Sequence, residues 1–116
     1  MDDYINDLKL RLRQFARERE WEQFHAPKNL SMALSVEASE LLEHFQWLSE
    51  QQSCELPADK LSEVSHEMAD VFIYLIRLAD TLDVDILKAV EEKIVLNASK
   101  YPADKVRGSS KKYNEY

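Results

Sequence analysis

The sequence predicts an all-α protein, a subunit of the four-helix-bundle type that associates into oligomers. Only one glycine, Gly108, occurs in 116 residues, whereas the tight turns of β-hairpins depend on glycine. Apolar residues recur at spacings of three and four in four successive segments, which is typical of amphipathic helices. Short links join these segments, so consecutive helices are expected to run antiparallel. Because so short a chain buries limited apolar surface by itself, association of subunits is expected.

The first helix is predicted over residues 2–20. Its apolar face comprises Ile5, Leu8, Leu12 and Phe15. A connection follows, because Pro27 disfavours a helical residue before it. Asn29 is expected to cap the second helix, over residues 29–48, by accepting from backbone N–H groups. The apolar face of that helix comprises Leu30, Ala33, Leu34, Leu41, Phe45 and Leu48.

A polar linker, Ser49–Glu55, leads to a third helix over residues 57–82, in which Pro57 is an early helical residue. Its apolar face comprises Leu61, Val64, Met68, Val71, Phe72, Leu75, Ala79 and Leu82. Asp83 or Asp85 is expected to cap a fourth helix that reaches about Lys100, before Pro102. A basic tail occupies about residues 102–116.

Length and composition indicate one compact domain over residues 1–116. Apolar residues make up 45% of the chain and charged residues 32%, as in globular proteins. The net charge of −7 disfavours binding to a nucleic-acid polymer. The longest apolar run, Val71–Ile76, is too short to span a membrane. A lone cysteine, Cys54, and an amino terminus without the features of a secretory leader favour the cytoplasm.

Two acidic pairs are the strongest indication of chemistry. Glu37-x-x-Glu40 lies in the second helix and Glu67-x-x-Asp70 in the third. The spacing puts each pair on one helical face, and Glu37 takes a place between Leu34 and Leu41 where a core residue is expected. If the two helices are antiparallel neighbours, both pairs face one groove. Four carboxylates there repel one another unless a cation neutralises them.

Oxygen-only ligation suits Mg²⁺, or Mn²⁺ as a substitute, and Mg²⁺ is commonly shared with substrate phosphates. We therefore expect a phosphorylated substrate. Lys93, Asn97 and Lys100 form a polar ridge on the fourth helix that could hold phosphate. The alternatives are that the acids form a solvated face and that Lys100 only offsets the helix dipole.

Aromatic residues could stack against a nucleobase, although such residues more often belong to a core or an interface. They are Trp21, Phe24 and His25 before the second helix, Phe45 and Trp47 at its end, and Tyr74 one turn after Asp70.

With these motifs in place, the sequence resembles the MazG-like all-α nucleoside triphosphate pyrophosphohydrolases, in the branch that contains the dCTP pyrophosphatases. The resemblance runs from about Leu8 to Tyr113. Besides the acidic pairs, it rests on Trp21-Glu22-Gln23-Phe24-His25-x-Pro27-x-Asn29-Leu30, Phe45-Gln46-Trp47 and Tyr101-Pro102.

The resemblance implies a dimer or tetramer that cleaves a deoxynucleoside triphosphate between the α- and β-phosphates, releasing the monophosphate and pyrophosphate to clean the nucleotide pool. dCTP is the first expectation for the substrate, with dATP and modified dNTPs as open alternatives. The implied metal ligands and catalytic residues are Glu37, Glu40, Glu67 and Asp70. The implied substrate contacts are Trp21, His25, Trp47, Tyr74, Lys93, Asn97 and Lys100.

Two positions depart from the family's pattern. Val36 stands where many relatives have a further Glu, a candidate general base, and Leu12 stands where some dCTP-cleaving relatives have a base-contacting His. Three other functions stay open: a ferritin-like di-iron bundle built on Glu63-x-x-His66, a non-catalytic helical oligomerisation or adaptor module, and the same fold acting on another triphosphate, such as a phosphoribosyl-linked one.

Overall fold

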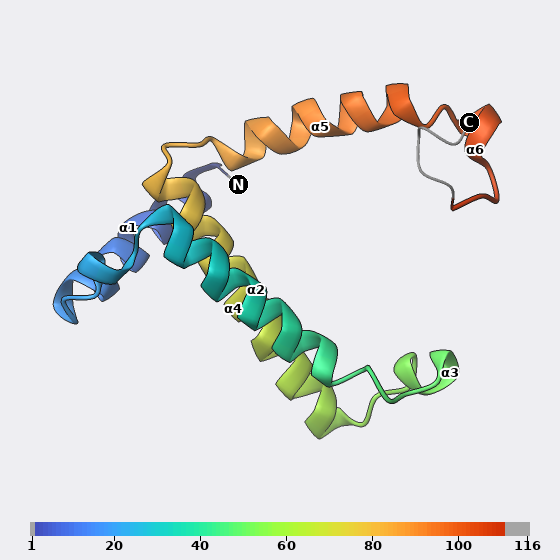
Figure 1. Cartoon of the computed structure of the whole chain (residues 1–116), viewed down its shortest axis with the longest axis horizontal. Helices are drawn as coiled ribbons and strands as arrows, with labels where there is room; N and C mark the ends of the chain where they lie inside the picture. Colours follow the sequence, from blue (N-terminus) through green and yellow to red (C-terminus); the bar gives the residue numbers. More distant parts are fainter. Residues whose placement is uncertain (1, 111–116) are drawn as a thin grey trace. The chain divides into compact units, whose positions relative to one another are not determined.

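The protein is helical throughout the part that the computed structural model describes, residues 2–110 (Figure 1). Its elements are α1 (Asp2–Glu18), the 3-10 helix η1 (Glu22–Phe24), α2 (Pro27–Glu43), α3 (Glu50–Ser53), α4 (Ala58–Thr81), α5 (Ile86–Lys100) and α6 (Ala103–Val106). No strand occurs among the described residues, so the all-α prediction is confirmed. Part of the predicted basic tail lies outside them. No described helix is long and apolar enough to cross a membrane.

The chain divides into two compact units, one up to Asp83 and one from Val84. The first unit contains α1, η1, α2, α3 and α4, and the second contains α5 and α6. The predicted single domain with a four-helix subunit therefore stays a prediction, as does its association into oligomers.

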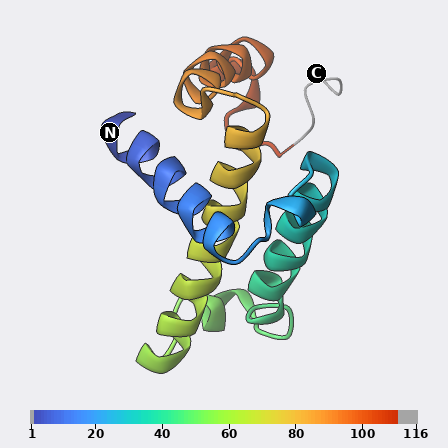
Figure 2. The same cartoon turned by 90° about the vertical axis from the view of Figure 1, so that its left-hand side faces the viewer.

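Helix α4 is the centre of the first unit, because it contacts both α1 and α2. Helices α2 and α4 run antiparallel, as expected for helices joined by a short link (Figures 1 and 2). The buried apolar side chains come from all three helices: Ile5, Leu8, Ala16, Leu30, Val64, Ile76 and Ala79. This packing fixes the relative positions of the acidic pairs on α2 and α4.

The predicted apolar face of α4 is only partly buried. Leu61, Met68 and Phe72 are 56%, 56% and 44% exposed. By contrast Ile76, which was not assigned to that face, is fully buried. The prediction was wrong on these points because α4 packs against two helices at different angles around its axis, so a single stripe does not describe its buried surface.

Helix α2 begins earlier than predicted, at Pro27, and ends earlier, at Glu43. Pro27 takes the first helical position, where its missing N–H costs nothing. The prediction that Asn29 caps this helix was wrong: Asn29 lies inside it, and its Nδ2 donates to the carbonyl of Phe24 at 3.2 Å. This hydrogen bond ties η1 to the start of α2.

The other helix ends agree with the prediction more closely. Pro57 precedes α4 rather than lying within it. Asp85 caps α5 by accepting from the backbone N–H of Lys88 at 3.1 Å, whereas Asp83 follows α4 in the left-handed conformation, with φ at 55°. The polar linker contains one element that was not predicted, α3, which begins with a capping box between Ser49 and Gln52.

Candidate functional site

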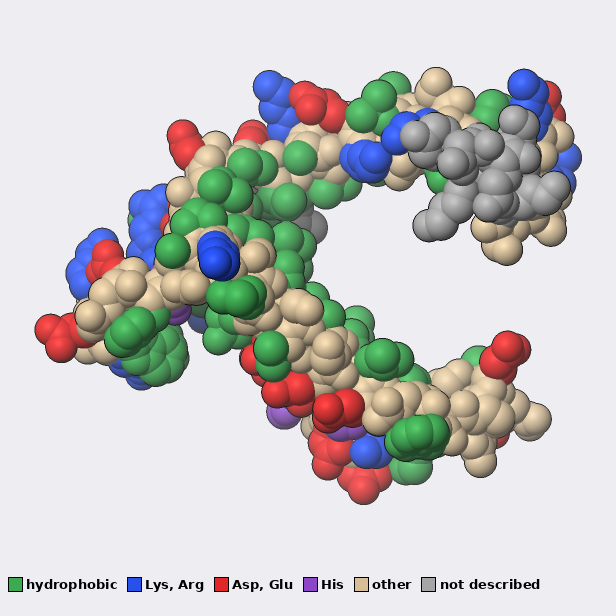
Figure 3. Space-filling view, viewed as in Figure 1, with side chains coloured by type: hydrophobic (Ala, Val, Ile, Leu, Met, Phe, Trp, Pro, Cys, Tyr) green, Lys and Arg blue, Asp and Glu red, His purple; other side chains and the backbone are tan. Residues whose placement is uncertain are grey.

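Three of the four predicted acids converge between α2 and α4. Glu37 of α2 and Glu67 and Asp70 of α4 each place a carboxylate oxygen within 4.8 Å of the others. Glu37 and Glu67 are half-buried, whereas Asp70 is exposed, so the cluster opens toward solvent on one side. Figure 3 shows acidic side chains gathered along the α2 and α4 pair.

Burial makes this cluster costly without a counter-charge. The Oε2 atoms of Glu37 and Glu67 are buried, and neither has a hydrogen-bond partner among the described residues. The pKa of Glu37 is raised from 4.5 to about 7, first by burial, then by its interaction with Glu40, and then by the charges of Asp70 and Glu67. Buried polar atoms of this kind normally have partners, so these two oxygens lack the positive or hydrogen-bonding partner that such atoms require.

Glu40 lies outside the group of three, but its carboxylate is near enough to raise the pKa of Glu37. On the other side, His44 Nε2 lies 3.9 Å from Glu67 Oε1. Lys60 Nζ lies 3.3 Å from both His44 Nδ1 and Glu63 Oε2. Glu40, His44 and Lys60 therefore lie around the cluster, and none of them is a hydrogen-bond partner of Glu37 Oε2 or Glu67 Oε2.

The donor set fits a hard divalent cation. It contains carboxylate oxygens only, which Mg²⁺ prefers, and its open side leaves room for water or substrate oxygens. The two partnerless oxygens are what a bound cation would satisfy. A ferritin-like di-iron site finds no support. Among the described residues, the only group of three or more side chains placed to hold a metal ion is Glu37, Glu67 and Asp70, and it includes neither Glu63 nor His66.

A cavity of about 310 Å³ adjoins the acidic cluster and shares Asp70 with it. Its lining comprises Leu12, Phe15, Ala16, Trp21, His25, Asp70, Ile73, Tyr74 and Arg77. The wall is therefore mostly apolar and aromatic, as in small-molecule sites that accept a flat ring. The pKa of Tyr74 is raised, chiefly by burial and then by the carboxylates of Glu37, Asp70 and Glu40, which places this phenol at the junction of cavity and cluster.

The end of α1 positions Trp21 in the cavity wall. Glu20 adopts the left-handed conformation, with φ at 53°. The N–H of Glu20 donates to the carbonyl of Arg17 at 3.1 Å, and the N–H of Trp21 donates to the carbonyl of Ala16 at 2.9 Å. These two bonds form a Schellman motif, which stops the helix and turns the chain. The Trp21 ring then packs edge-on against Phe15, with centroids 5.7 Å apart.

His25 is held by Arg77 from the opposite helix. Arg77 Nε donates to His25 Nδ1 at 3.2 Å, so this nitrogen acts as an acceptor and the ring proton lies on Nε2. The pKa of His25 is lowered, chiefly by burial and then by the positive charge of Arg77. His25 therefore stays neutral near pH 7.

The structure thus brings together Glu37, Glu67 and Asp70, with Glu40 beside them, and brings Trp21, His25 and Tyr74 into the adjoining cavity. Trp47 is 87% exposed, in the turn after α2, and is not part of the cavity wall. The three residues of the polar ridge, Lys93, Asn97 and Lys100, lie on α5 in the second unit, so their role in substrate binding stays a prediction.

Sequence reasoning missed Arg77, which lines the cavity and is 11% exposed. The available indication was a charged residue within the apolar sequence of α4, seven residues after Asp70 and therefore on the same helical face. The two departures from the family pattern are also placed: Leu12 lines the cavity, and Val36 is 56% exposed.

Comparison with known proteins agrees with this all-helical fold. The profile of the MazG-like family matches residues 32–116, and the chain belongs to this family. It is 40% identical to dCTP pyrophosphatase 1 of Mus musculus over 113 residues, and 40% identical to that of Homo sapiens over 114 residues. A crystal structure of a pyrophosphatase from Archaeoglobus fulgidus superposes with a TM-score of 0.80 at 40% identity.

The matches differ in how much of each protein they include. The two mammalian alignments cover 96% of this chain but 66% of the relative. The alignment with the archaeal structure covers 85% of this chain and 93% of that one. The chain thus spans about two thirds of the length of the mammalian relatives and nearly all of the archaeal structure.

Proposed function

We propose that this protein is a Mg²⁺-dependent nucleoside triphosphate pyrophosphohydrolase that converts a deoxynucleoside triphosphate and water into the monophosphate and pyrophosphate. The observation that carries the proposal is the group of three acids with two buried, partnerless oxygens, Glu37 Oε2 and Glu67 Oε2, beside an aromatic cavity. The activities named for the mammalian and archaeal relatives support it. Such an enzyme cleans the nucleotide pool, and dCTP is the first substrate to test.

In this proposal Glu37, Glu67 and Asp70 bind Mg²⁺ and Glu40 completes the ligand set. When bound there, the ion would offset the charge of the triphosphate and would lower the pKa of the attacking water. Mn²⁺ serves as a substitute. Trp21 and Tyr74 hold the base by stacking and burial, while Asp70, which belongs to both cluster and cavity, fixes the distance between base and phosphates.

Lys93, Asn97 and Lys100 are proposed to bind the leaving pyrophosphate, and Trp47 to close over the base. Both assignments depend on how subunits and units assemble. We propose a homodimer or homotetramer, because Leu61, Met68 and Phe72 leave a stripe of apolar surface on α4 that a second subunit can cover. A location in the cytoplasm agrees with the unpaired, exposed Cys54.

The test is pyrophosphate release from the standard and C5-modified dNTPs and NTPs, with Mg²⁺ and with a chelator. We expect turnover that requires the metal and that is abolished in Glu40→Ala and Asp70→Ala, while the helical circular dichroism spectrum is unchanged. Glu43→Ala, an exposed glutamate on the same helix as Glu40, is the matched control and should remain active.

Two results would count against the proposal. Release of no pyrophosphate from any triphosphate would favour a non-catalytic helical module, in which the acids are only surface charge. Full activity in Asp70→Ala would show that catalysis does not use this cluster.

A further inference from the structure

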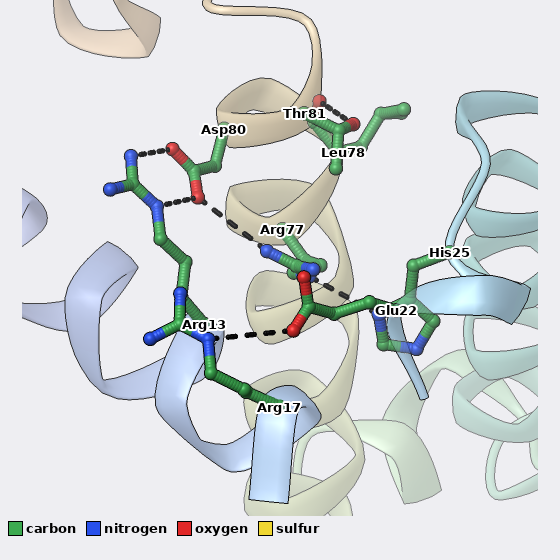
Figure 4. Close-up of polar contacts among 8 residues, drawn as sticks. All are labelled: Arg13, Arg17, Glu22, His25, Arg77, Leu78, Asp80 and Thr81. Carbon is green, nitrogen blue, oxygen red and sulfur yellow. Dashed lines mark hydrogen bonds and ion pairs between the residues drawn. The ribbon is translucent and has the colours of Figure 1, made fainter. Parts of the chain in front are cut away.

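Four polar residues, Arg13, Asp80, Arg77 and His25, form a network (Figure 4), and Arg77 and His25 also line the cavity. Arg13 of α1 donates to Asp80 of α4 through two nitrogens, Nε to Oδ2 at 2.6 Å and Nη2 to Oδ1 at 2.5 Å. Arg77 Nη1 lies 3.6 Å from Asp80 Oδ2, and Arg77 Nε donates to His25 Nδ1. This network therefore connects α1, α4 and the segment that precedes α2.

This network holds the Arg77 guanidinium in one place. The side chains of Arg77 and Asp80 are only 11% and 7% exposed. Asp80 contacts two guanidinium groups at once, so one carboxylate faces two positive charges. Its pKa is lowered chiefly by the hydrogen bond with Arg13, so Asp80 stays ionised. Arg77 contacts His25 through Nε and Asp80 through Nη1, and these two contacts together fix the plane of the guanidinium, which one ion pair alone would not do.

Arg77 keeps donors that these contacts do not use. A guanidinium carries five N–H donors and no acceptor. Nε is directed to His25 and Nη1 faces Asp80, whereas Nη2 has no hydrogen-bond partner within residues 2–110. Because Arg77 lines the cavity, its remaining donors are available to a ligand bound there.

The position of Arg77 along α4 matches the base end of a nucleotide. Asp70, Tyr74 and Arg77 follow the spacing i, i+4 and i+7, so they share one face of the helix. At about 1.5 Å of rise per residue, Arg77 lies roughly 10 Å along the axis from Asp70. With phosphates at the acidic cluster and the base beside Tyr74, the outer edge of the base reaches the level of Arg77.

We propose that Arg77 is a specificity-determining residue that selects bases whose outer edge, the edge facing Arg77, carries two adjacent acceptor atoms, as the N3 and O2 of cytosine or the N7 and O6 of guanine do. The N–H donors that the contacts with His25 and Asp80 leave unused, on the two terminal nitrogens, donate to both atoms at once. Thymine places an N–H between its two carbonyls and adenine places an amino group beside N7, so each directs a donor at the donors of Arg77. The inference rests on the proposed function and adds a residue that recognises the base.

Asp80 and Arg13 are positioning residues in this scheme. They do not touch the substrate, but they hold the fork in the plane that a base edge requires. Loss of Asp80 is therefore expected to weaken selection between bases, through KM more than kcat, without abolishing turnover of the poorer substrates.

The test compares the wild type with Arg77→Met, which keeps the length of the side chain but removes the donors, and Arg77→Lys, which keeps the charge but loses the fork. Arg11→Met, on an exposed arginine of α1, is the matched control. The measurement is kcat/KM for dCTP, dGTP, dTTP and dATP with Mg²⁺. Calorimetric titration with dCMP and dTMP, without metal, reports base recognition independently of turnover.

We expect the wild type to prefer dCTP or dGTP over dTTP and dATP, and the dCTP to dGTP ratio identifies which base the cavity admits. Arg77→Met should reduce that preference roughly 10- to 100-fold, mainly by raising KM, with Arg77→Lys and Asp80→Asn in between and Arg11→Met unchanged. If Arg77→Met does not fold, Arg77→Lys and Asp80→Asn still carry the test.

The measurements distinguish failure of the proposed function from failure of the role assigned to Arg77. A wild type that hydrolyses no dNTP refutes the proposed function, while tighter binding of dCMP than dTMP that is lost in Arg77→Lys would still support the role of Arg77. An active wild type that prefers dTTP or dATP, or an unchanged base preference in the folded Arg77 variants, would overturn the inference.

Discussion

Replacing Glu37 by glutamine should stabilise the metal-free protein at pH 8 and remove its response to Mg²⁺. The pKa of Glu37 is about 7 in the folded protein, against 4.5 for an unperturbed glutamate, because of burial and then of the neighbouring carboxylates. At about 1.4 kcal/mol per pH unit, ionising this side chain costs the fold up to about 3.5 kcal/mol above pH 7. Partial exposure of the cluster reduces this cost to roughly 1–2 kcal/mol through solvent screening.

The direction in which the free energy of unfolding changes with pH follows from proton binding at Glu37. Between pH 4.5 and 7 the folded state binds more protons at Glu37 than the unfolded state does, so the free energy of unfolding falls as the pH rises through this window. The Glu37→Gln variant lacks this fall. A cation that binds only the folded wild type adds stability with its concentration, so saturating Mg²⁺ should reverse the order of the two proteins.

The assay is urea unfolding followed by circular dichroism at pH 5 and pH 8, with EDTA and with Mg²⁺. Glu43→Gln, an exposed position near the end of the same helix, should change stability by no more than about 0.5 kcal/mol in every condition. The reasoning is refuted if Glu37→Gln is no more stable than the wild type in EDTA at pH 8, or if both proteins respond equally to Mg²⁺.

Three further changes test the fold. Ile76→Ala empties the most deeply buried position of α4 and should cost about 2–5 kcal/mol in urea unfolding. Glu20→Gly relieves the left-handed backbone that ends α1 and should stabilise by roughly 0.5–1 kcal/mol, whereas a loss would show that the side chain matters more. Asp80 has a lowered pKa, held down first by Arg13, so its contribution is present at pH 7 and lost as the pH falls through the folded value. Asp80→Asn should therefore be less stable than the wild type at pH 7 and lose less stability in acid, as thermal melts between pH 3 and pH 7 would show.

Helical periodicity was enough to predict the main helices of the fold, because apolar spacing and Pro or Asp at the helix ends are local properties of the chain. It was insufficient for the buried surface of α4. Burial of Ile76 and exposure of Met68 depend on which neighbours pack against the helix, and a single sequence contains no direct record of those neighbours. Similarly, Asn29 has the chemistry of a cap, but Pro27 already starts the helix two residues earlier.

The acidic part of the site was predictable because Glu37 interrupts an apolar stripe, and a charged residue in such a place needs a reason. The polar network was not. Arg13 and Asp80 are 67 positions apart, and neither has a periodic or motif context that would pair them. Arg77 differs, because its spacing from Asp70 was visible in the sequence, although its contact with His25 depends on the path of the chain between α1 and α2.

Helix α4 provides both the metal-binding acids and the arginine at the far end of the cavity. In such a helix, the number of residues between two side chains sets both the distance and the rotation between them. One residue inserted between Asp70 and Tyr74 would rotate everything beyond it by about 100° and turn Arg77 out of the cavity. Variation in substrate choice is therefore expected through exchange of side chains along this face, while the number of residues between the two ends stays constant.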